Sequence, residues 1–488
     1  MIYGGIDIGT TGSKITIFNN NNELFKIYKK YSLDRRHGID EIDPNIILET
    51  VLELIKESYF KNADIEGIGI TSFGETFVLL DEEENILMNS MLYTDKRGLE
   101  ELKDIKELIG EDKIREITGL TLSEMYSLPK ILYVKKHSPD IFSKVKHICL
   151  IEDYIVFSLT GYKYIDYSLA TRTMMFDYKV KKWSTEILST FGIDEKLLSL
   201  PVKIGNNAGF IRDEVKKRIG ISKNIKIINV SHDQISSALG AGLFNRGEAI
   251  DGCGTCECLT PLFDNNADLN GISKNNFCLV PFDDTNHFVC YSLLYTGGAL
   301  IEWFIKTYCK DINTSEIFKY LNKDFDYNKT DILVFPHFSG MITPVKDTDA
   351  RGAIFNLTLD SKREDIYKAI LESLCFEMKI NIQRLKKHRV AIERIIATGG
   401  GSKNECWMQL KADILGIPIS TLTNHDAGTV GAAFIVGTTL GVFKDYKEGF
   451  NKLSKINKTY VPRKEFCDYY DIKFKKYSKI YNSIKGIF

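Results

Sequence analysis

Three kinds of signal are missing from this chain of 488 residues, and each absence excludes a class of protein. The formal net charge is only −1, so no excess of positive charge favours nucleic acid or an anionic membrane as a partner. The longest uncharged run, 427–443, is short for a membrane span and rich in Gly and Thr, which favours a buried helix. No signal-peptide pattern opens the chain, because Asp7 interrupts the apolar residues there. We therefore expect a cytoplasmic protein.

The cysteines form no secretory framework. There are ten, they are scattered, and without a secretory signal they are expected to be reduced thiols. Their one cluster is Cys253, Cys256 and Cys258, whose Cys-x-x-Cys spacing raises a zinc or redox hypothesis. No second Cys or His pair stands at zinc-ribbon spacing, and Gly and Thr surround the cluster, so a different role for this segment is favoured.

The familiar nucleotide motifs are also missing. A P-loop enzyme would contain G-x-x-x-x-G-K-[ST], and a Rossmann enzyme would contain G-x-G-x-x-G between a strand and a helix; here the first glycine turn joins two strands. A composition of 44% hydrophobic and 26% charged residues is ordinary for a soluble globular enzyme. The length favours two large domains, although Pro-rich and low-complexity linkers are absent.

What the chain does have is an unusual hairpin at its beginning. Two predicted strands flank the turn, in which Gly9 and Gly12 bracket two threonines. Glycine lets backbone N–H groups point into the turn, threonine adds hydroxyl donors, and Lys14 adds positive charge. Asp7 stands just before the turn, where it could hold a metal ion through water. These residues are typical of a phosphate-binding hairpin; an ordinary Gly-rich turn with a surface lysine is the alternative.

The same pattern recurs at 248–260, where an apolar strand, a Gly/Thr turn and an alternating strand follow one another. Two such hairpins in one chain indicate two related halves. We place the boundary near 243–247, which gives an N-terminal domain at 1–244 and a C-terminal domain at 245–488.

Further elements are predicted from capping signals and apolar periodicity. Helices are expected from Asp43-Pro44, over 103–117 and over 127–137, and strands over 65–71, 77–80 and 225–230. Capping boxes at Ser361/Glu364 and Ser402/Glu405 predict two more helices. The second follows the glycine turn 399–401, where backbone can approach an anionic or flat ligand closely.

Together these parts match the needs of phosphoryl transfer. That reaction requires donors around the phosphates, a divalent metal ion, and a carboxylate that deprotonates the attacking hydroxyl. Two hairpins, the glycine turn, and the strand-end residues Asp7 and Asp233 would supply these parts. Asp233 also precedes a predicted helix, so a role as its cap is the structural alternative.

At this point the chain resembles the FGGY family of carbohydrate kinases, within the actin/hexokinase/Hsp70 ATPase superfamily, over nearly its whole length. Residues 7–14 are similar to the family's first phosphate motif, 231–234 to the segment of its catalytic base, 252–255 to its second phosphate motif and 398–404 to its adenosine motif. Residues 125–133 and 351–372 follow its two longer signatures, with Tyr133 where Trp is usual and Asn356 where Gly is usual.

The resemblance implies an α/β fold of two RNase H-like domains, with sugar binding in the first, adenine nucleotide binding in the second and a nucleotide cleft between them. It implies that Asp233 is the general base, that Asp7 holds Mg²⁺ through water, and that ATP is the co-substrate. The phosphates would be bound by Gly9, Thr10, Thr11, Gly12, Lys14, Gly254 and Thr255, and the nucleoside by Gly298, Gly400 and Asn404. Sugar contacts are expected from Glu75 and Asp95, with Arg97 in the same segment.

The acceptor is less well defined by the resemblance. Glycerol kinases pair their Glu with a preceding Arg, and xylulokinases have Met-His, whereas this chain has Gly74-Glu75. Glu75 could also be a solvated loop charge. A ketopentose such as xylulose or ribulose is the expected substrate, glycerol or another polyol is the alternative, and a homodimer stays open. A function of another class, an ATP-driven clamp without a sugar acceptor, is known on the same scaffold.

Overall fold

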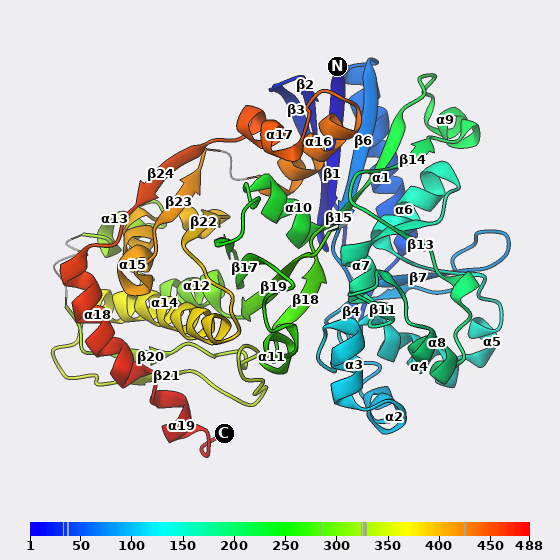
Figure 1. The fold of residues 1–488 in the computed structure, drawn as a ribbon. Coiled ribbons are helices and arrows are strands. Elements are labelled where there is room, and N and C mark those ends of the chain that lie inside the picture. The colour runs from blue at the N-terminus through cyan, green and yellow to red at the C-terminus, as the bar shows by residue number, and fades with distance from the viewer. Residues whose placement is uncertain (33, 37–38, 284, 324, 326–328, 424–425) are drawn as a thin grey trace. The chain divides into compact units, whose positions relative to one another are not determined.

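The computed structural model describes residues 1–32, 34–36, 39–283, 285–323, 325, 329–423 and 426–488, which form two compact units (Figure 1). Unit 1 comprises residues 1–242, 279–288 and 426–455, and unit 2 comprises 243–278, 289–425 and 456–488. The first crossing between the units falls between Gly242 and Leu243, and two later segments return to unit 1. Within the described residues, every helix is too short or too polar to cross a membrane.

A mixed sheet forms the centre of unit 1. Its strand order is β14-β15-β6-β1-β2-β3, with bounds Asn206–Phe210, Lys226–His232, Ile65–Ser72, Ile2–Ile8, Gly12–Asn19 and Asn22–Lys30. Strands β1 and β2 pair antiparallel, with Asp7 opposite Lys14, so the predicted opening hairpin is confirmed. Strands β1, β6 and β15 run parallel, and their carboxyl ends therefore lie at one edge of the sheet.

Side-chain alternation along β1 assigns its two faces to different helices. Ile6 and Ile8 belong to the apolar core that includes residues of α1 (Pro44–Lys61) and α6 (Ile151–Thr160). On the other face, a Cβ placed on Gly5 would lie 2.5 Å from Cβ of Ala432 in α16 (Ala427–Thr439). Helix α16 is the buried helix predicted for the long uncharged run, and it can lie close to β1 only because position 5 has no side chain.

The second large sheet, most of whose strands belong to unit 2, repeats this arrangement. Its order is β18-β19-β17-β16-β22-β23-β24, with bounds Cys278–Pro281, His287–Leu294, Glu257–Asp264, Glu248–Cys253, Arg394–Thr398, Ile419–Leu422 and Ile456–Tyr460. An antiparallel hairpin, β16–β17, is followed by two strands parallel to its first strand and then by an antiparallel edge strand, the same sequence of pairings as in unit 1. The predicted internal repeat is therefore confirmed.

Most predicted helices are found. Helix α1 begins after Asp43, whose side chain accepts the N–H of Asn45 at 2.9 Å, and α4 spans Ser127–His137 as predicted. The helix predicted over 103–117 is instead two helices, α2 (Glu101–Leu108) and α3 (Glu111–Thr118). Gly110, with φ 92°, separates them in a conformation that would break a continuous helix.

Both predicted capping boxes are wrong in position. Helix α14 (Arg363–Lys387) begins after Lys362, and the hydroxyl of Ser361 accepts the N–H of Thr358 at 2.9 Å instead of capping it. Helix α15 (Glu405–Leu415) is capped by Asn404, because the glycine turn first continues into a short 3-10 helix at Gly400–Lys403. The end of α15 at Gly416, in the left-handed region, agrees with the prediction.

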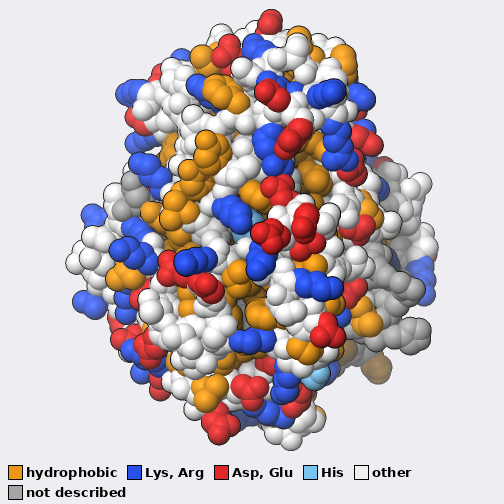
Figure 2. Space-filling model, turned by 90° about the vertical axis from the view of Figure 1, so that its right-hand side faces the viewer, with side chains coloured by type: hydrophobic (Ala, Val, Ile, Leu, Met, Phe, Trp, Pro, Cys, Tyr) orange, Lys and Arg blue, Asp and Glu red, His pale blue; other side chains and the backbone are white. Residues whose placement is uncertain are grey.

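The surface carries charges of both signs. Figure 2 shows acidic and basic side chains intermixed over the face that it displays, in keeping with the net charge of −1. No large field of one sign covers this face that would attract a polyanion.

Candidate active site

In unit 1, three parallel strands bring three carboxylates to one sheet edge. Asp7 lies near the end of β1, Glu75 follows β6, and Asp233 directly follows β15 as the first residue of α10 (Asp233–Gly240). The register aligns the strand ends, since Asp7 pairs with Thr71 and Thr71 pairs with Ser231. The carboxyl edge of a parallel sheet is the usual position of a binding site in an open α/β fold.

Asp233 has the environment of a proton acceptor. Burial, together with the negative charges of Asp7 and Glu75, raises the pKa of this carboxyl to about 8, although Arg172 lowers it. Oδ1 of Asp233 lies 3.2 Å from Nε2 of His232. Burial, with Arg172, lowers the pKa of His232 well below its ordinary value, so this imidazole is neutral and cannot serve as a counter-ion. A carboxylate poised near neutral pH is suited to general base catalysis.

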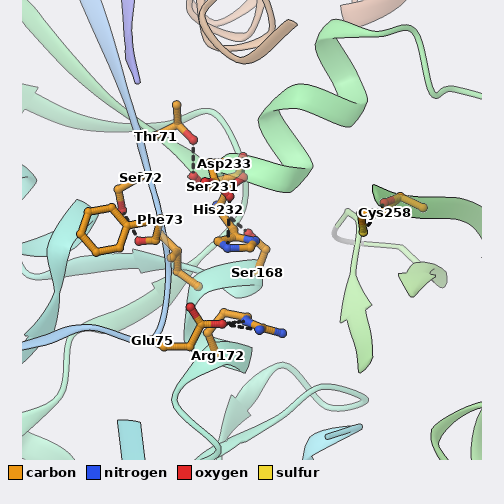
Figure 3. Close-up of polar contacts among 12 residues, drawn as sticks. Thr71, Ser72, Phe73, Glu75, Ser168, Arg172, Ser231, His232, Asp233 and Cys258 are labelled. Carbon is orange, nitrogen blue, oxygen red and sulfur yellow. Dashed lines mark hydrogen bonds and ion pairs between the residues drawn. The ribbon is translucent and has the colours of Figure 1, made fainter. Parts of the chain in front are cut away.

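Glu75 forms a buried ion pair with a residue that the sequence did not single out. Its Oε1 accepts the Nε–H of Arg172 at 2.6 Å, and Nη2 of Arg172 contacts the same oxygen. Arg172 comes from α7 (Tyr167–Arg172), and its guanidinium lies 5.0 Å from the ring of Tyr126. Figure 3 shows the pair beside His232 and Asp233, beyond the ends of β6 and β15. The solvated-loop interpretation of Glu75 is wrong, since the residue is 5% exposed.

The backbone at Glu75 is unusual. Glu75 has φ 65°, in the left-handed region, and Ser127 anchors its carbonyl by donating a hydrogen bond at 2.7 Å. A Cβ placed on the preceding Gly74 would lie 3.0 Å from Cγ of Arg172 and 3.1 Å from Cδ2 of His232. A larger residue at position 74 would therefore displace the ion pair or the imidazole.

The opening hairpin holds its lysine between two acids. Lys14 Nζ lies 3.2 Å from Asp7 Oδ2 and 2.5 Å from Oδ1 of Asp426, which directly precedes α16. Burial, together with Asp426, raises the pKa of Asp7, while Lys14 lowers it. The turn closes through the Gly9 N–H, which donates to the Gly12 carbonyl at 3.0 Å. The hydroxyl-bearing residues Thr10 and Thr11 are partly or fully exposed in this turn.

Asp95 and Arg97 form a separate pair. The Asp95 carboxylate accepts the Nε–H of Arg97 at 2.9 Å and the backbone N–H of Asp40 at 3.0 Å, and Arg97 also contacts Glu41 at 2.7 Å. Arg97 thus pairs with two acids. Both oxygens of Asp95 accept from protein donors, so direct contact with a sugar stays a prediction.

In unit 2, the second hairpin supports the start of a helix. The turn at Gly254–Thr255 offers its carbonyls to the first N–H groups of α12 (Gly297–Tyr308): Gly298 donates to Gly254 at 2.8 Å and Ala299 to Thr255 at 3.0 Å. A Cβ on Gly298 would lie 2.6 Å from the Gly254 oxygen, so only glycine permits this approach. The turn residues themselves are exposed.

This hairpin and the glycine turn line a cavity of about 860 Å³, which is large enough for a nucleotide. The predicted residues Gly254, Thr255, Gly298, Gly400 and Asn404 all line it. Its apolar wall includes Ile301, Ile305, Phe318 and Trp407, and a Cβ on Gly400 would meet nothing within 4 Å. An apolar pocket with backbone N–H groups and small residues suits a flat base and its phosphates.

The side-chain oxygen and nitrogen of Asn404 both form hydrogen bonds within this wall of the cavity. Its Oδ1 accepts the Trp407 N–H at 3.2 Å as the cap of α15, and its Nδ2 donates to the Tyr367 hydroxyl at 2.9 Å. Asn322 donates to the same Oδ1 at 3.3 Å. Asn404 therefore fixes the start of α15 at the pocket, and its direct contact with a nucleoside stays a prediction.

The chain matches one family over most of its length. The N-terminal domain profile of the FGGY family of carbohydrate kinases matches residues 2–240, and the C-terminal domain profile matches residues 253–439. The chain therefore belongs to the FGGY family of carbohydrate kinases, which are ATP-dependent phosphotransferases. This membership decides against the clamp hypothesis.

Individual relatives are kinases of this family and differ in the substrate for which they are named. The chain is 27% identical to a xylulose kinase of Staphylococcus xylosus, over 99% of both chains, and 29% identical to a glycerol kinase of Streptococcus gordonii, over 91% of this chain and 90% of the relative. Its fold is similar to that of a ligand-bound xylulose kinase from Lactobacillus acidophilus, with a TM-score of 0.90 at 24% identity over 99% and 98% of the two chains. The two RNase H-like domains predicted for the chain are thereby confirmed.

Proposed function

We propose that this kinase transfers the γ-phosphoryl group of ATP to a hydroxyl of a small neutral sugar, with a ketopentose such as xylulose or ribulose as the substrate. The observation that carries the proposal is the meeting of Asp7, Glu75 and Asp233 at the carboxyl edge of the unit 1 sheet. The similarity to the Staphylococcus xylosus xylulose kinase supports the choice of sugar. In this assignment residues 1–244 provide sugar binding and 245–488 provide nucleotide binding.

Electrostatics favour an uncharged acceptor. Besides burial, the negative charges of Asp7 and Glu75 raise the pKa of Asp233, so the edge is a region of negative potential. The cations nearby are already engaged, Arg172 with Glu75, Lys14 with Asp7 and Asp426, and Lys130 with the Glu124 carbonyl. A carboxylate on the acceptor would meet this negative potential without a free counter-charge, so sugar acids are disfavoured.

The chemistry assigned to each residue follows from its position. Glu75 accepts hydrogen bonds from sugar hydroxyls, with its carboxylate held in place by Arg172. Asp233, once ionised, takes the proton of the attacking hydroxyl as its oxygen attacks the γ-phosphorus in line. Phosphate binding is assigned to Gly254 and Thr255 of the second hairpin and to Gly9, Thr10, Thr11, Gly12 and Lys14 of the first, and nucleoside binding to Gly298, Gly400 and Asn404.

The residues at the edge also fit a magnesium ion. Asp7 is a partly buried carboxylate whose negative charge raises the pKa of Asp233, and a divalent cation relieves such an accumulation of negative charge. Asp7 would hold the ion through water. Mg²⁺ would supply neutralisation of the charge that develops on the transferred phosphoryl group.

A polyol such as glycerol is the second candidate, and one observation favours it. Glycerol kinases pair their Glu with an Arg, and here Arg172 supplies an arginine beside Glu75 in space although Gly74 replaces it in sequence. The similarity to the Streptococcus gordonii enzyme points the same way.

The test is an ADP-coupled assay across ketoses, aldoses, polyols and sugar acids, with ATP hydrolysis in the absence of sugar as the control. We expect strong stimulation of ADP formation by one neutral sugar, with the phosphorylated product identified by mass spectrometry. Stimulation by glycerol would replace the ketopentose with the second candidate. Stimulation by sugar acids alone, or by no member of the panel, would contradict the proposal.

A further inference from the structure

A buried cluster of charges lies at the base of the second hairpin, and the reaction as described does not use it. Lys411 of α15 has no side-chain exposure, and its Nζ contacts Oδ2 of Asp251 and Oε1 of Glu257. The same Nζ lies 3.2 Å from Sγ of Cys253. Asp251 and Cys253 end β16 and Glu257 begins β17, so the three partners flank the turn at Gly254–Thr255.

Every N–H donor of the Lys411 ammonium has an acceptor in the cluster. An ammonium group has three N–H donors, and here three acceptors surround it. Nζ also lies 4.2 Å from the centroid of the Trp407 ring, which adds a cation–π contact. Burial raises the pKa of Glu257 toward neutrality, which lowers the cost of placing two carboxyl groups beside one ammonium.

The same atoms could have formed a metal site. Ligand atoms of Asp251, Cys253 and Glu257 lie within 4.8 Å of one another, one of two such groups within the described parts of the chain. The Lys411 ammonium lies against all three and uses the acceptors that a metal ion would need. The Lys411 ammonium therefore takes the place of a metal ion, and the acceptors that zinc would need at the cysteine cluster are already used. The other two thiols are engaged elsewhere, Cys256 with the Tyr295 carbonyl at 3.4 Å and Cys258 with Thr260 at 3.7 Å.

The position of the cluster connects two walls of the nucleotide cavity. Lys411 ties both arms of the β16–β17 hairpin to α15, and the first turn of α15 lines the same cavity as the hairpin turn. The two walls pack without spare room, since a Cβ on Gly401 would lie 2.9 Å from Cβ of Cys253 and 2.6 Å from the Trp407 ring. A small displacement of the hairpin would thus change the spacing between its turn and the glycine turn.

We infer that Lys411 is a positioning residue for nucleotide binding: it holds the phosphate-binding turn Gly254–Thr255 at a fixed distance from the nucleoside-binding turn Gly399–Gly401. This inference rests on the proposed function for the identity of the ligand, a nucleoside di- or triphosphate. Lys411 acts through the hairpin, because its buried Nζ has no exposed surface with which to touch the nucleotide.

The test measures ADP affinity by isothermal titration calorimetry on the full chain, which requires neither turnover nor knowledge of the sugar. Lys411→Met removes the tie, and Lys411→Met with Asp251→Asn also removes the carboxylate that would otherwise be left unpaired. The matched control is Lys473→Met with Glu372→Gln, which removes another buried Lys–Glu pair of unit 2, between α18 (Lys464–Tyr477) and α14, that does not line the cavity.

We expect the Lys411 variants to lose ADP affinity by about 10- to 100-fold, the scale expected when a binding group is misplaced by roughly 1 Å. The Lys473/Glu372 control should bind ADP like the wild type at a similar loss of thermal stability. Wild-type ADP affinity in a folded Lys411 variant would overturn the inference. So would failure of both Lys411 variants to fold while the control folds, since the cluster would then serve folding itself. A wild-type chain that binds no ADP would instead refute the proposed function.

Discussion

Replacing Asp233 with asparagine should stabilise the protein, with an effect that depends on pH. Burial raises the pKa of this carboxyl from 3.8 to about 8 in the folded state. Between those values the folded state binds more protons than the unfolded state, so ionisation of Asp233 lowers stability as the pH rises and the full cost is present above about pH 8. The asparagine variant carries no such cost, because its side chain does not ionise.

The magnitude follows from the shift. A change from 3.8 to about 8 corresponds to about 6 kcal/mol at high pH. The Asp233 side chain is 29% exposed, and water screens part of this charge, so we expect a measured gain of about 2 kcal/mol near pH 8.5. Near pH 5.5 less than about half of that gain should remain, since the folded carboxyl is then protonated in the wild type.

Urea unfolding of wild type and Asp233→Asn at the two pH values, followed by circular dichroism, checks both numbers. Asp95→Asn is the contrasting control in the same unit. Hydrogen bonds from Arg97 and Asp40 hold the pKa of Asp95 below its usual range, so that variant should lose stability near neutral pH. An Asp233→Asn protein that is less stable than wild type, or equally stabilised at both pH values, would refute the electrostatic description of the site.

Four further substitutions, in two pairs, test the unit 2 cavity and the unit 1 sheet edge separately. Gly298→Ala should weaken ADP binding by about tenfold or more, because the new Cβ would lie 2.6 Å from the Gly254 oxygen. Gly252→Ala is the control, because the nearest atom to its Cβ would be 3.6 Å away, and it should bind ADP normally. Equal ADP affinities of the two variants in calorimetry would contradict the packing at the hairpin. Glu75→Gln should lower the pKa of Asp233 and shift the rising limb of the pH profile of kcat/KM to lower pH, while Arg172→Gln should shift it to higher pH. Shifts in the same direction would show that these charges do not set the pKa of the base.

Much of the site could be predicted because its parts are local. Each part can be recognised within a few residues of sequence: a turn with two glycines between strands, a carboxylate at a strand end, and three glycines before a helix. The structure places Asp7, Glu75 and Asp233 at one sheet edge and the predicted unit 2 residues around one cavity. The predicted helix caps were one residue early at Ser361 and two residues early at Ser402. In the second case the backbone after Gly399 forms a 3-10 turn that no side-chain pattern predicts.

The residues that were missed come from distant elements. Arg172 reaches Glu75 across 97 positions and Lys411 reaches Asp251 across 160, and neither stands in a pattern that differs from an ordinary amphipathic helix. Asp426 reaches Lys14 across 412 positions. Such pairs depend on how strands and helices pack, so a single sequence carries no local signal for them.

The central claim is that Asp233 is the general base of a sugar kinase, and its most direct test is the turnover of Asp233→Ala. With ATP and the identified sugar both saturating, phosphorylated sugar is counted by mass spectrometry, and ADP binding is measured in parallel. We predict unchanged ADP affinity and a loss of turnover of about 100- to 10,000-fold, the usual contribution of a general base. Turnover near that of the wild type, in a variant that binds ADP normally, would contradict it.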